Sequence, residues 1–172
     1  MSLDERLLLA ARTRGHTPER ERAVARFSRL GEHAGVWLAI GVAGAAVDPR
    51  RRGRWRAATG TVAATYALNT AIKFVVRRPR PHLAGLPPLT GTPSGLSFPS
   101  AHASTAFAGA LLYKRLGVPA PPLYALAAAL TLSRLYLGVH YPSDLLAGAA
   151  LGTALAAARS DSADADARPE AT

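Results

Sequence analysis

Five apolar segments dominate this chain, and none of them has a polar face. They cover roughly residues 34–47, 55–76, 99–112, 123–138 and 142–158. A helix that is apolar all round its surface lies either inside a large protein core or in lipid. A chain of 172 residues is too short to surround five such helices with protein. The sequence therefore predicts an all-α fold, an integral membrane bundle of about five helices.

Each segment is short for a membrane span, which usually needs about 20 consecutive apolar residues. Arginine side chains at the segment ends can snorkel to the membrane surface and so lengthen the effective span. Gly148 and Gly152 form a G-x-x-x-G pair in the last segment, which allows a neighbouring helix to approach closely. This pattern favours a multi-pass protein of the cell membrane.

A basic segment, residues 1–32, precedes the apolar part of the chain. Within it, Thr17 is placed to cap a helix that begins at Pro18. We expect an N-terminal amphipathic helix that lies on the membrane or packs against the bundle. Residues 33–158 form the predicted membrane domain. The acidic tail, residues 159–172, is poor in apolar residues and is predicted to be disordered.

The chain carries an excess of positive charge, with Lys+Arg 21 against Asp+Glu 11 and a formal net charge of +10. Such an excess indicates an anionic partner, which can be nucleic acid, an anionic membrane surface or a phosphorylated substrate. The apolar segments favour membrane lipids and a lipid phosphate over nucleic acid. Cysteine is absent, which excludes disulfides and thiolate metal sites.

Three clusters of charged and polar residues stand at the ends of apolar segments. They are KFVVRRPRP with Lys73, Arg77, Arg78 and Arg80, FPSAHAS with Ser100 and His102, and SRLYLGVHYPSD with Arg134, His140 and Asp144. The second segment ends and the third begins on one side of the membrane, and the fourth and fifth meet on that same side. All three clusters are therefore expected at one membrane face. Arg77 and Arg78 are interpreted as charges that face the interface or the substrate.

The cationic residues of these clusters suit a phosphate group. Lys73, Arg80 and Arg134 supply positive charge and directional donors for its non-bridging oxygens. An arginine within an apolar segment is costly and functional by default, which singles out Arg134. Ser100 is placed to cap a helix, whose first backbone amides form a natural anion site. Taken alone, RRPRP is also typical of a positively charged flank, and Ser100 of a simple cap.

The remaining residues suit phosphoryl transfer through a phosphohistidine. His140 and Asp144 are four residues apart, and a carboxylate that binds one imidazole nitrogen leaves the other free to attack. His102 remains as an acid or base for the leaving group. A single His-x-x-x-Asp pair is more often structural, so this interpretation depends on the three clusters meeting. Two histidines and one aspartate among so many cations do not suit a metal, so no metal is expected.

The order and spacing of these motifs resemble the three-part signature of the type 2 phosphatidic acid phosphatase (PAP2) superfamily, which also includes vanadium haloperoxidases. That pattern is K-x6-RP, then PSGH, then SR-x5-H-x3-D, and it is matched here between Lys73 and Asp144. The chain departs from it at Ala101, where the family usually has glycine. One added methyl group is tolerated there if φ is negative.

The resemblance implies a role for each matching residue. The phosphate-binding residues would be Lys73, Arg80, Ser100 and Arg134. His102 would protonate the leaving alkoxide, and His140, oriented by Asp144, would be the nucleophile. The implied activity is that of a phosphoric monoester hydrolase, a lipid-phosphate phosphatase that needs no metal or other cofactor.

A narrower likeness concerns the substrate. LGEHAGVW and GTPSGLSFPSAHAST are similar to small actinobacterial members that are proposed to dephosphorylate decaprenylphosphoryl-5-phosphoribose in cell-wall biosynthesis. A polyprenylphosphoryl-phosphoribose is therefore the favoured substrate. Phosphatidic acid, phosphatidylglycerol phosphate and undecaprenyl diphosphate are the other candidates.

Two other functions are compatible with parts of the sequence. A non-catalytic basic membrane module that binds anionic lipid would keep the arginines, but it has no need of the spacing between His140 and Asp144. A vanadate-dependent haloperoxidase would keep the whole signature, but such enzymes are soluble and much larger.

The positive-inside rule gives an expected orientation. It places the loop at residues 50–56 and the pair Lys114 and Arg115 in the cytoplasm, so the active site faces outward. Five spans would then put the N-terminal segment outside as well, although that segment is rich in arginine. Either this segment does not follow the rule or one apolar segment does not span, and an active site on the cytoplasmic side is the alternative.

Overall fold

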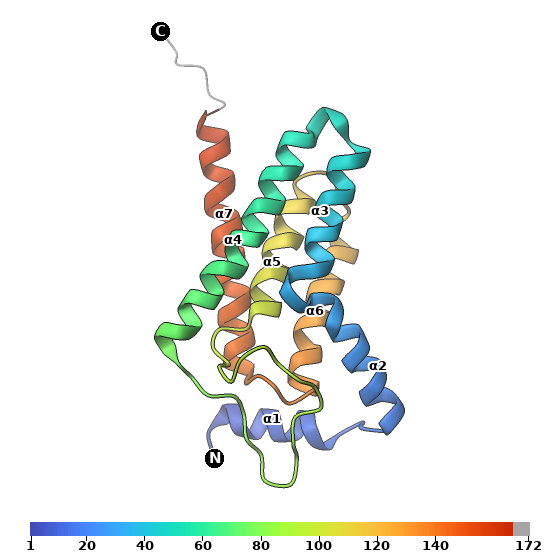
Figure 1. Cartoon of the computed structure of the whole chain (residues 1–172), viewed down its shortest axis with the longest axis vertical. Helices are drawn as coiled ribbons and strands as arrows, with labels where there is room; N and C mark the ends of the chain where they lie inside the picture. Colours follow the sequence, from blue (N-terminus) through green and yellow to red (C-terminus); the bar gives the residue numbers. More distant parts are fainter. Residues whose placement is uncertain (167–172) are drawn as a thin grey trace.

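The computed structural model describes residues 1–166, and these form a bundle of helices (Figure 1). The helices are α1 (Leu3–Thr13), α2 (Pro18–Ser28), η1 (Arg29–Ala34), α3 (Gly35–Val47), η2 (Pro49–Arg51), α4 (Arg52–Val76), α5 (Ala101–Lys114), α6 (Ala120–Tyr136) and α7 (Pro142–Asp166). Among the described residues there is no extended strand, only two isolated β-bridges in the loop between α4 and α5. The predicted all-α class is confirmed.

Helices α3 to α7 coincide with the five apolar segments of the sequence. The last of them is longer than expected: α7 continues to Asp166, so it includes the first part of the segment that was predicted to be disordered. The rest of that segment, residues 167–172, lies outside the described residues.

The N-terminal segment contains two helices where the sequence predicted one. Helix α2 begins as expected, because the side chain of Thr17 accepts a hydrogen bond from the amide of Arg20 and Pro18 is the first helical residue. Helix α1 was not predicted. It begins with a capping box in which Ser2 and Glu5 exchange side-chain and backbone hydrogen bonds. In Figure 1, α1 lies across one end of the bundle, beside the α4–α5 loop.

Helix α5 is the centre of the bundle and packs against α4, α6 and α7. Its contact with α7 is close because of the two glycines of the G-x-x-x-G pair. A Cβ atom at Gly148 would lie 2.5 Å from the carbonyl oxygen of Ser100, and one at Gly152 would lie closer still to the carbonyl oxygen of Ser104. The glycines therefore allow the two backbones to touch, as the sequence predicted.

The outer surface of the bundle is apolar in many places. Large exposed apolar side chains include Val42, Val47, Phe74, Val75, Leu132 and Leu146. By length and composition, one helical stretch of the described residues, Pro18–Val47, is long and apolar enough to cross a membrane. It comprises α2, η1 and α3, with a backbone break at Glu32 and His33. The expected five spans stay a prediction.

Candidate active site

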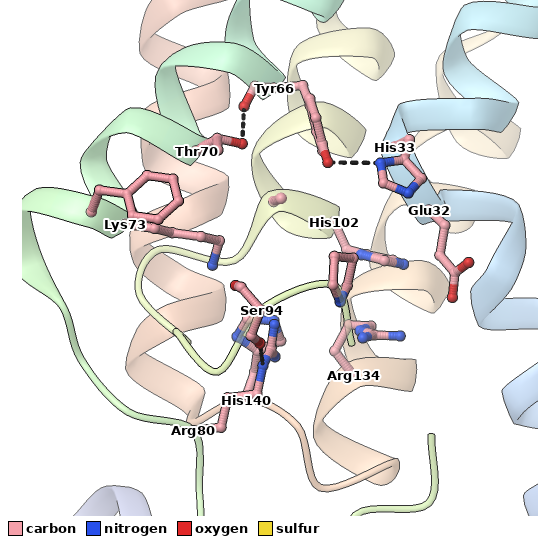
Figure 2. Close-up of a pocket in the computed structure, with 13 residues that line it drawn as sticks. Glu32, His33, Tyr66, Thr70, Lys73, Arg80, Ser94, His102, Arg134 and His140 are labelled. Carbon is pink, nitrogen blue, oxygen red and sulfur yellow. Dashed lines mark hydrogen bonds between the residues drawn. The ribbon is translucent and has the colours of Figure 1, made fainter. Parts of the chain in front are cut away.

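A cavity of about 190 Å³ lies at the end of the bundle where α4 and α6 finish and α5 begins. It is lined by Glu32, His33, Tyr66, Thr70, Lys73, Phe74, Arg80, Pro93, Ser94, Ala101, His102, Arg134 and His140. Figure 2 shows Lys73 entering from α4 and Arg134 from α6, with Arg80 and His140 between them. The three sequence clusters therefore meet in one place. Ser100 and Asp144 are not among the lining residues, and both are fully buried.

The arginines of the cavity are fixed by neighbouring groups. Arg80 donates from Nε to the carbonyl of Ser94 at 2.8 Å and from Nη1 to the carbonyl of Val139 at 2.7 Å. Arg134 donates from Nη1 to the hydroxyl of Ser28 at 2.8 Å. Its buried Nε has no acceptor among the described residues. A buried guanidinium donor without an acceptor is costly, and an anion in the cavity would satisfy it.

Lys73 is engaged differently from the arginines. Its Nζ donates to the carbonyls of Pro99 at 2.7 Å and Ser97 at 3.0 Å, and lies 3.4 Å from that of Leu96. An ammonium group has three donors, so these three carbonyls match its full capacity. Lys73 therefore fixes the loop that leads into α5, and it adds positive charge at the edge of the cavity.

His140 follows α6 in the turn to α7, and its contacts define its tautomer. Arg80 Nη1 lies 3.2 Å from Nε2 of His140. A guanidinium can only donate, so Nε2 accepts and the ring proton is on Nδ1. Nδ1 lies 3.4 Å from Oδ2 of Asp144, the carboxylate that the sequence predicted to face one nitrogen of this ring.

Burial, together with the charges of Arg80, Lys73 and Arg134, lowers the pKa of His140 to about 3 although Asp144 opposes the shift. Nε2 is therefore unprotonated at neutral pH, as the proposed nucleophile requires, and its lone pair is engaged only by the hydrogen bond from Arg80.

The N-terminus of α5 forms another wall of the cavity. Ser100 caps this helix by accepting a hydrogen bond from the amide of Ala103 at 3.4 Å. Its own amide donates to the carbonyl of Asp144 at 3.0 Å, which joins α5 to the start of α7. Ala101 and His102 then line the cavity at the first turn of α5. The contribution of Ser100 in this geometry is to place that turn.

His102 is held by the main chain of the N-terminal segment. Its Nε2 lies 3.0 Å from the carbonyl oxygen of Ser28. A carbonyl only accepts, so Nε2 carries the proton and Nδ1 of the neutral ring carries the lone pair. The neutral ring is therefore ready to act as a base through Nδ1. It acts as an acid there only when doubly protonated.

Sequence reasoning missed the part that residues 28–34 play in this site. Ser28 contacts His102 through its carbonyl, and its hydroxyl contacts Ser133 and Arg134. Gly31 lies against the His102 ring, and a Cβ atom there would be 2.6 Å from Cδ2. Glu32 lines the cavity directly. The only sequence signal for these contacts was the stretch LGEHAGVW. It was interpreted as a similarity to known relatives and not as a segment that contacts the site.

The described residues contain no group of three or more His, Asp or Glu side chains that could hold a metal ion. Instead, three cationic side chains surround two histidines, an arrangement that suits binding and transfer of a phosphoryl group.

The comparisons with known proteins agree with this arrangement. The model of the PAP2 superfamily matches residues 54–164. The chain belongs to the PAP2 superfamily.

Two curated relatives are similar to much of the chain. The decaprenylphosphoryl-5-phosphoribose phosphatase of Mycolicibacterium smegmatis is 48% identical over 122 residues, which cover 70% of this chain and 67% of that protein. The protein of the same name from Mycobacterium tuberculosis is 44% identical over 131 residues, which cover 76% of this chain and 73% of the relative.

A solved structure shares the fold. The crystal structure of a transmembrane PAP2-type phosphatidylglycerolphosphate phosphatase from Bacillus subtilis has a TM-score of 0.78 and 23% sequence identity. The match covers 97% of this chain and 87% of that one. The family model and the two relatives confirm the predicted family, and the solved structure shows the same fold.

Proposed function

We propose that this chain is a lipid-phosphate phosphatase that hydrolyses a phosphomonoester of a membrane lipid through a phosphohistidine on His140. The class of enzyme agrees with the family and with relatives that are named phosphatases. The observation that supports the site most directly is the buried Nε of Arg134, which has no acceptor among the described residues. Arg134 lines the cavity together with two further cations, Lys73 and Arg80.

In the first step, the phosphoryl group occupies the cavity and its non-bridging oxygens accept from Arg134 and Arg80. Nε2 of His140 leaves its contact with Arg80 and attacks phosphorus. The bond from phosphorus to the lipid oxygen breaks, and that oxygen takes a proton from Nδ1 of a doubly protonated His102. Asp144 stabilises the Nδ1 proton of the phosphorylated imidazole ring.

In the second step, water attacks the phosphohistidine and the bond between phosphorus and Nε2 breaks. His102, now neutral, accepts a proton from the attacking water at Nδ1. Inorganic phosphate leaves, and His140 is restored in its starting tautomer. No step needs a resident metal ion.

The favoured substrate is a polyprenylphosphoryl-phosphoribose. Beyond the cations, the cavity has a wall of hydrogen-bonding groups from Glu32, His33, Tyr66 and Thr70. Nδ1 of His33 and the hydroxyl of Tyr66 are 2.8 Å apart (Figure 2). A carboxylate beside an anion pocket accepts hydrogen bonds from sugar hydroxyls, and it repels a second phosphate that is bonded directly to the first, as in a diphosphate. The leaving group that suits this wall is therefore hydroxylated, as in the compound that gives the two relatives their name.

We further propose that α3 to α7 cross the cell membrane and that the active site faces outward. The apolar outer surface of the bundle supports immersion in lipid. The arginines of η2 and of the start of α4 lie at the end of the bundle away from the cavity, which the positive-inside rule assigns to the cytoplasm. We also propose that the phosphatase unit includes residues 28–32 in addition to the expected 33–158, because Ser28 and Gly31 lie against His102.

The proposed function is tested by phosphate release from the purified, detergent-solubilised protein. The panel contains polyprenylphosphoryl-phosphoribose, phosphatidic acid, phosphatidylglycerol phosphate and undecaprenyl diphosphate. We expect the first to have the highest kcat/KM, and Glu32→Ala to lower it by about tenfold for that substrate alone. Equal losses on phosphatidic acid would contradict a sugar-binding role for Glu32.

The same assay separates this mechanism from metal-dependent hydrolysis. Activity should survive EDTA, and vanadate should inhibit, because it mimics the five-coordinate transition state in a cationic pocket. Loss of activity in EDTA that magnesium restores would point to a metal-dependent mechanism. The relatives that are named phosphatases do not favour the non-catalytic module or the haloperoxidase.

A further inference from the structure

Arg78 lies between the lysine and the arginine of the first motif but does not line the cavity. Its guanidinium instead links two carboxylates. Nη1 donates to Oδ1 of Asp144 at 2.9 Å, and Nη2 donates to Oδ2 of Asp4 at 2.9 Å. Nη1 also donates to the hydroxyl of Ser143 at 2.7 Å. The expectation that Arg78 faces the interface or the substrate does not describe these contacts.

Asp4 belongs to the first turn of α1, yet it binds the start of α7. It accepts from the amide of Ser143 at 3.0 Å, and the Ser143 hydroxyl also donates to it. Partial burial opposes ionisation of this carboxyl, but the hydrogen bonds from Ser143 and Arg78 outweigh burial and hold its pKa below the ordinary value. Asp4 is therefore a charged N-terminal partner of α7, supplied by a different helix.

Asp144 is held on both of its oxygens. Oδ1 accepts from Arg78, and Oδ2 accepts from the amide of Tyr141 at 2.8 Å while it faces Nδ1 of His140. The Arg78 guanidinium is itself seated on the Tyr141 ring, with Cζ 4.2 Å from the centroid. A carboxylate fixed at both ends cannot rotate away from the imidazole. Its negative charge is also stabilised, so it does not take the Nδ1 proton for itself.

We propose that Arg78 and Asp4 are positioning residues for Asp144, so that α1 is a required part of the catalytic unit. The proposal rests on the phosphohistidine mechanism given above. Arg78 acts through Asp144 and His140, and it does not touch the phosphoryl group. Asp4 acts one step further away, by fixing the second end of the Arg78 guanidinium.

The competing role for Arg78 is direct binding of phosphate. The two roles differ in what they change. A phosphate ligand contributes to the affinity for substrate and vanadate, whereas a positioning residue contributes to the rate of phosphohistidine formation. They also differ in coupling, because two residues that act through one carboxylate are not additive.

The test is a double-mutant cycle in the full-length protein, with the variants Arg78→Gln, Asp144→Asn and their combination. Turnover and single-turnover phosphoenzyme formation are measured on the best lipid phosphate of the panel. Arg78→Gln should lower kcat by about ten- to a hundredfold, with KM and the vanadate inhibition constant within about twofold of wild type. In the Asp144→Asn background, Arg78→Gln should lower kcat by less than about threefold.

Asp4→Asn supplies a second, independent arm. It keeps the size of the side chain and should lower kcat by about three- to tenfold. The decrease in kcat caused by Asp4→Asn should also nearly vanish in the Asp144→Asn background. This arm tests the proposal if Arg78→Gln does not fold, which gel filtration in detergent detects. Arg50→Gln is the matched control, because Arg50 is exposed in η2 at the end of the bundle away from the cavity, so it should leave kcat and KM unchanged.

Two results would overturn the proposal. Losses that multiply in the double variants would mean that Arg78 and Asp4 act independently of Asp144. A raised KM and weaker vanadate inhibition with unchanged phosphoenzyme formation would make Arg78 a phosphate ligand. A wild-type protein that releases no phosphate from any lipid in the panel would instead overturn the proposed function, which is a separate outcome.

Discussion

The two histidines of the site are held by partners of different kinds. His140 faces the side chain of Asp144, four residues later in the chain. His102 binds the main-chain carbonyl of Ser28, 74 residues earlier. A side-chain partner must be a particular residue type at a particular spacing, so it leaves a motif in the sequence. A carbonyl partner is available at any residue, so it leaves none.

The two surroundings also differ in what maintains them. The His140 side is built from charged side chains of the loop after α4 and of the first turn of α7. The His102 side depends on how closely the segment from Ser28 to Gly31 packs on the first turn of α5. Substitutions should therefore act through charge on the first side and through shape on the second.

The largest effect is expected from His140→Ala. Removing the proposed nucleophile should reduce turnover by on the order of 10⁴-fold or more and abolish any covalent phosphoenzyme. Both are measured with radiolabelled phosphate on a lipid substrate and on nitrophenyl phosphate, and both substrates should be affected. A phosphoenzyme that persists in this variant and disappears in His102→Ala would exchange the roles of the two histidines.

His102→Ala should have a smaller effect that depends on the leaving group. General acid catalysis contributes roughly a hundredfold to ten-thousandfold when the leaving group is an alkoxide. Nitrophenolate leaves without a proton, so His102→Ala should lower kcat on nitrophenyl phosphate much less than kcat on the lipid phosphate. The measurement is the ratio of the two kcat values in the variant and in wild type. An unchanged ratio would remove the acid role from His102.

The contrast between the two histidines also explains how far the sequence could be interpreted. Five apolar segments predicted α3 to α7, because a helix without a polar face is visible in composition alone. The ordered motifs predicted the cavity residues Lys73, Arg80 and Arg134, because charge in an apolar chain is costly and stands out. The predicted domain boundary at residue 33 was placed where the amino-acid composition changes. Composition does not show which residues before that boundary contact the site.

The missed contacts have physical reasons too. Helix α1 was not predicted, because its contacts are with distant parts of the chain. It packs against α6 and α7, Leu8 is fully buried, and Asp4 binds Ser143 at the start of α7. Arg78 is one of several arginines in its motif. The sequence alone does not show that its guanidinium binds two carboxylates, those of Asp144 and Asp4. Ser28 acts on His102 through a backbone group that every residue possesses.

A third prediction tests the shape of the His102 side. A methyl group at Gly31 would lie 2.6 Å from the imidazole, so Gly31→Ala must move His102 or the segment that holds it. We expect kcat to fall by about tenfold on the lipid phosphate and by less on nitrophenyl phosphate, the same pattern as His102→Ala in weaker form.

The control for this prediction is Gly60→Ala in α4, where an added Cβ meets nothing within 4 Å. Alanine is a better helix former than glycine, so this variant should keep full activity and equal or higher thermal stability. If Gly31→Ala lowers kcat equally on the lipid phosphate and on nitrophenyl phosphate, the segment from Ser28 to Gly31 supports the whole cavity and not His102 in particular.

The smallest effect is expected from Ser28→Ala, which separates the two functions of one residue. The carbonyl that binds His102 remains, while the hydroxyl that accepts from Arg134 is lost. A hydrogen bond of this kind contributes about 1 kcal/mol net, so KM should rise by about fivefold as Arg134 becomes less well placed for phosphate. Because His102 keeps its partner, the ratio of lipid to nitrophenyl rates should equal that of wild type. A ratio that shifts toward nitrophenyl phosphate would mean that the side chain of Ser28, and not only its backbone, determines how His102 is held.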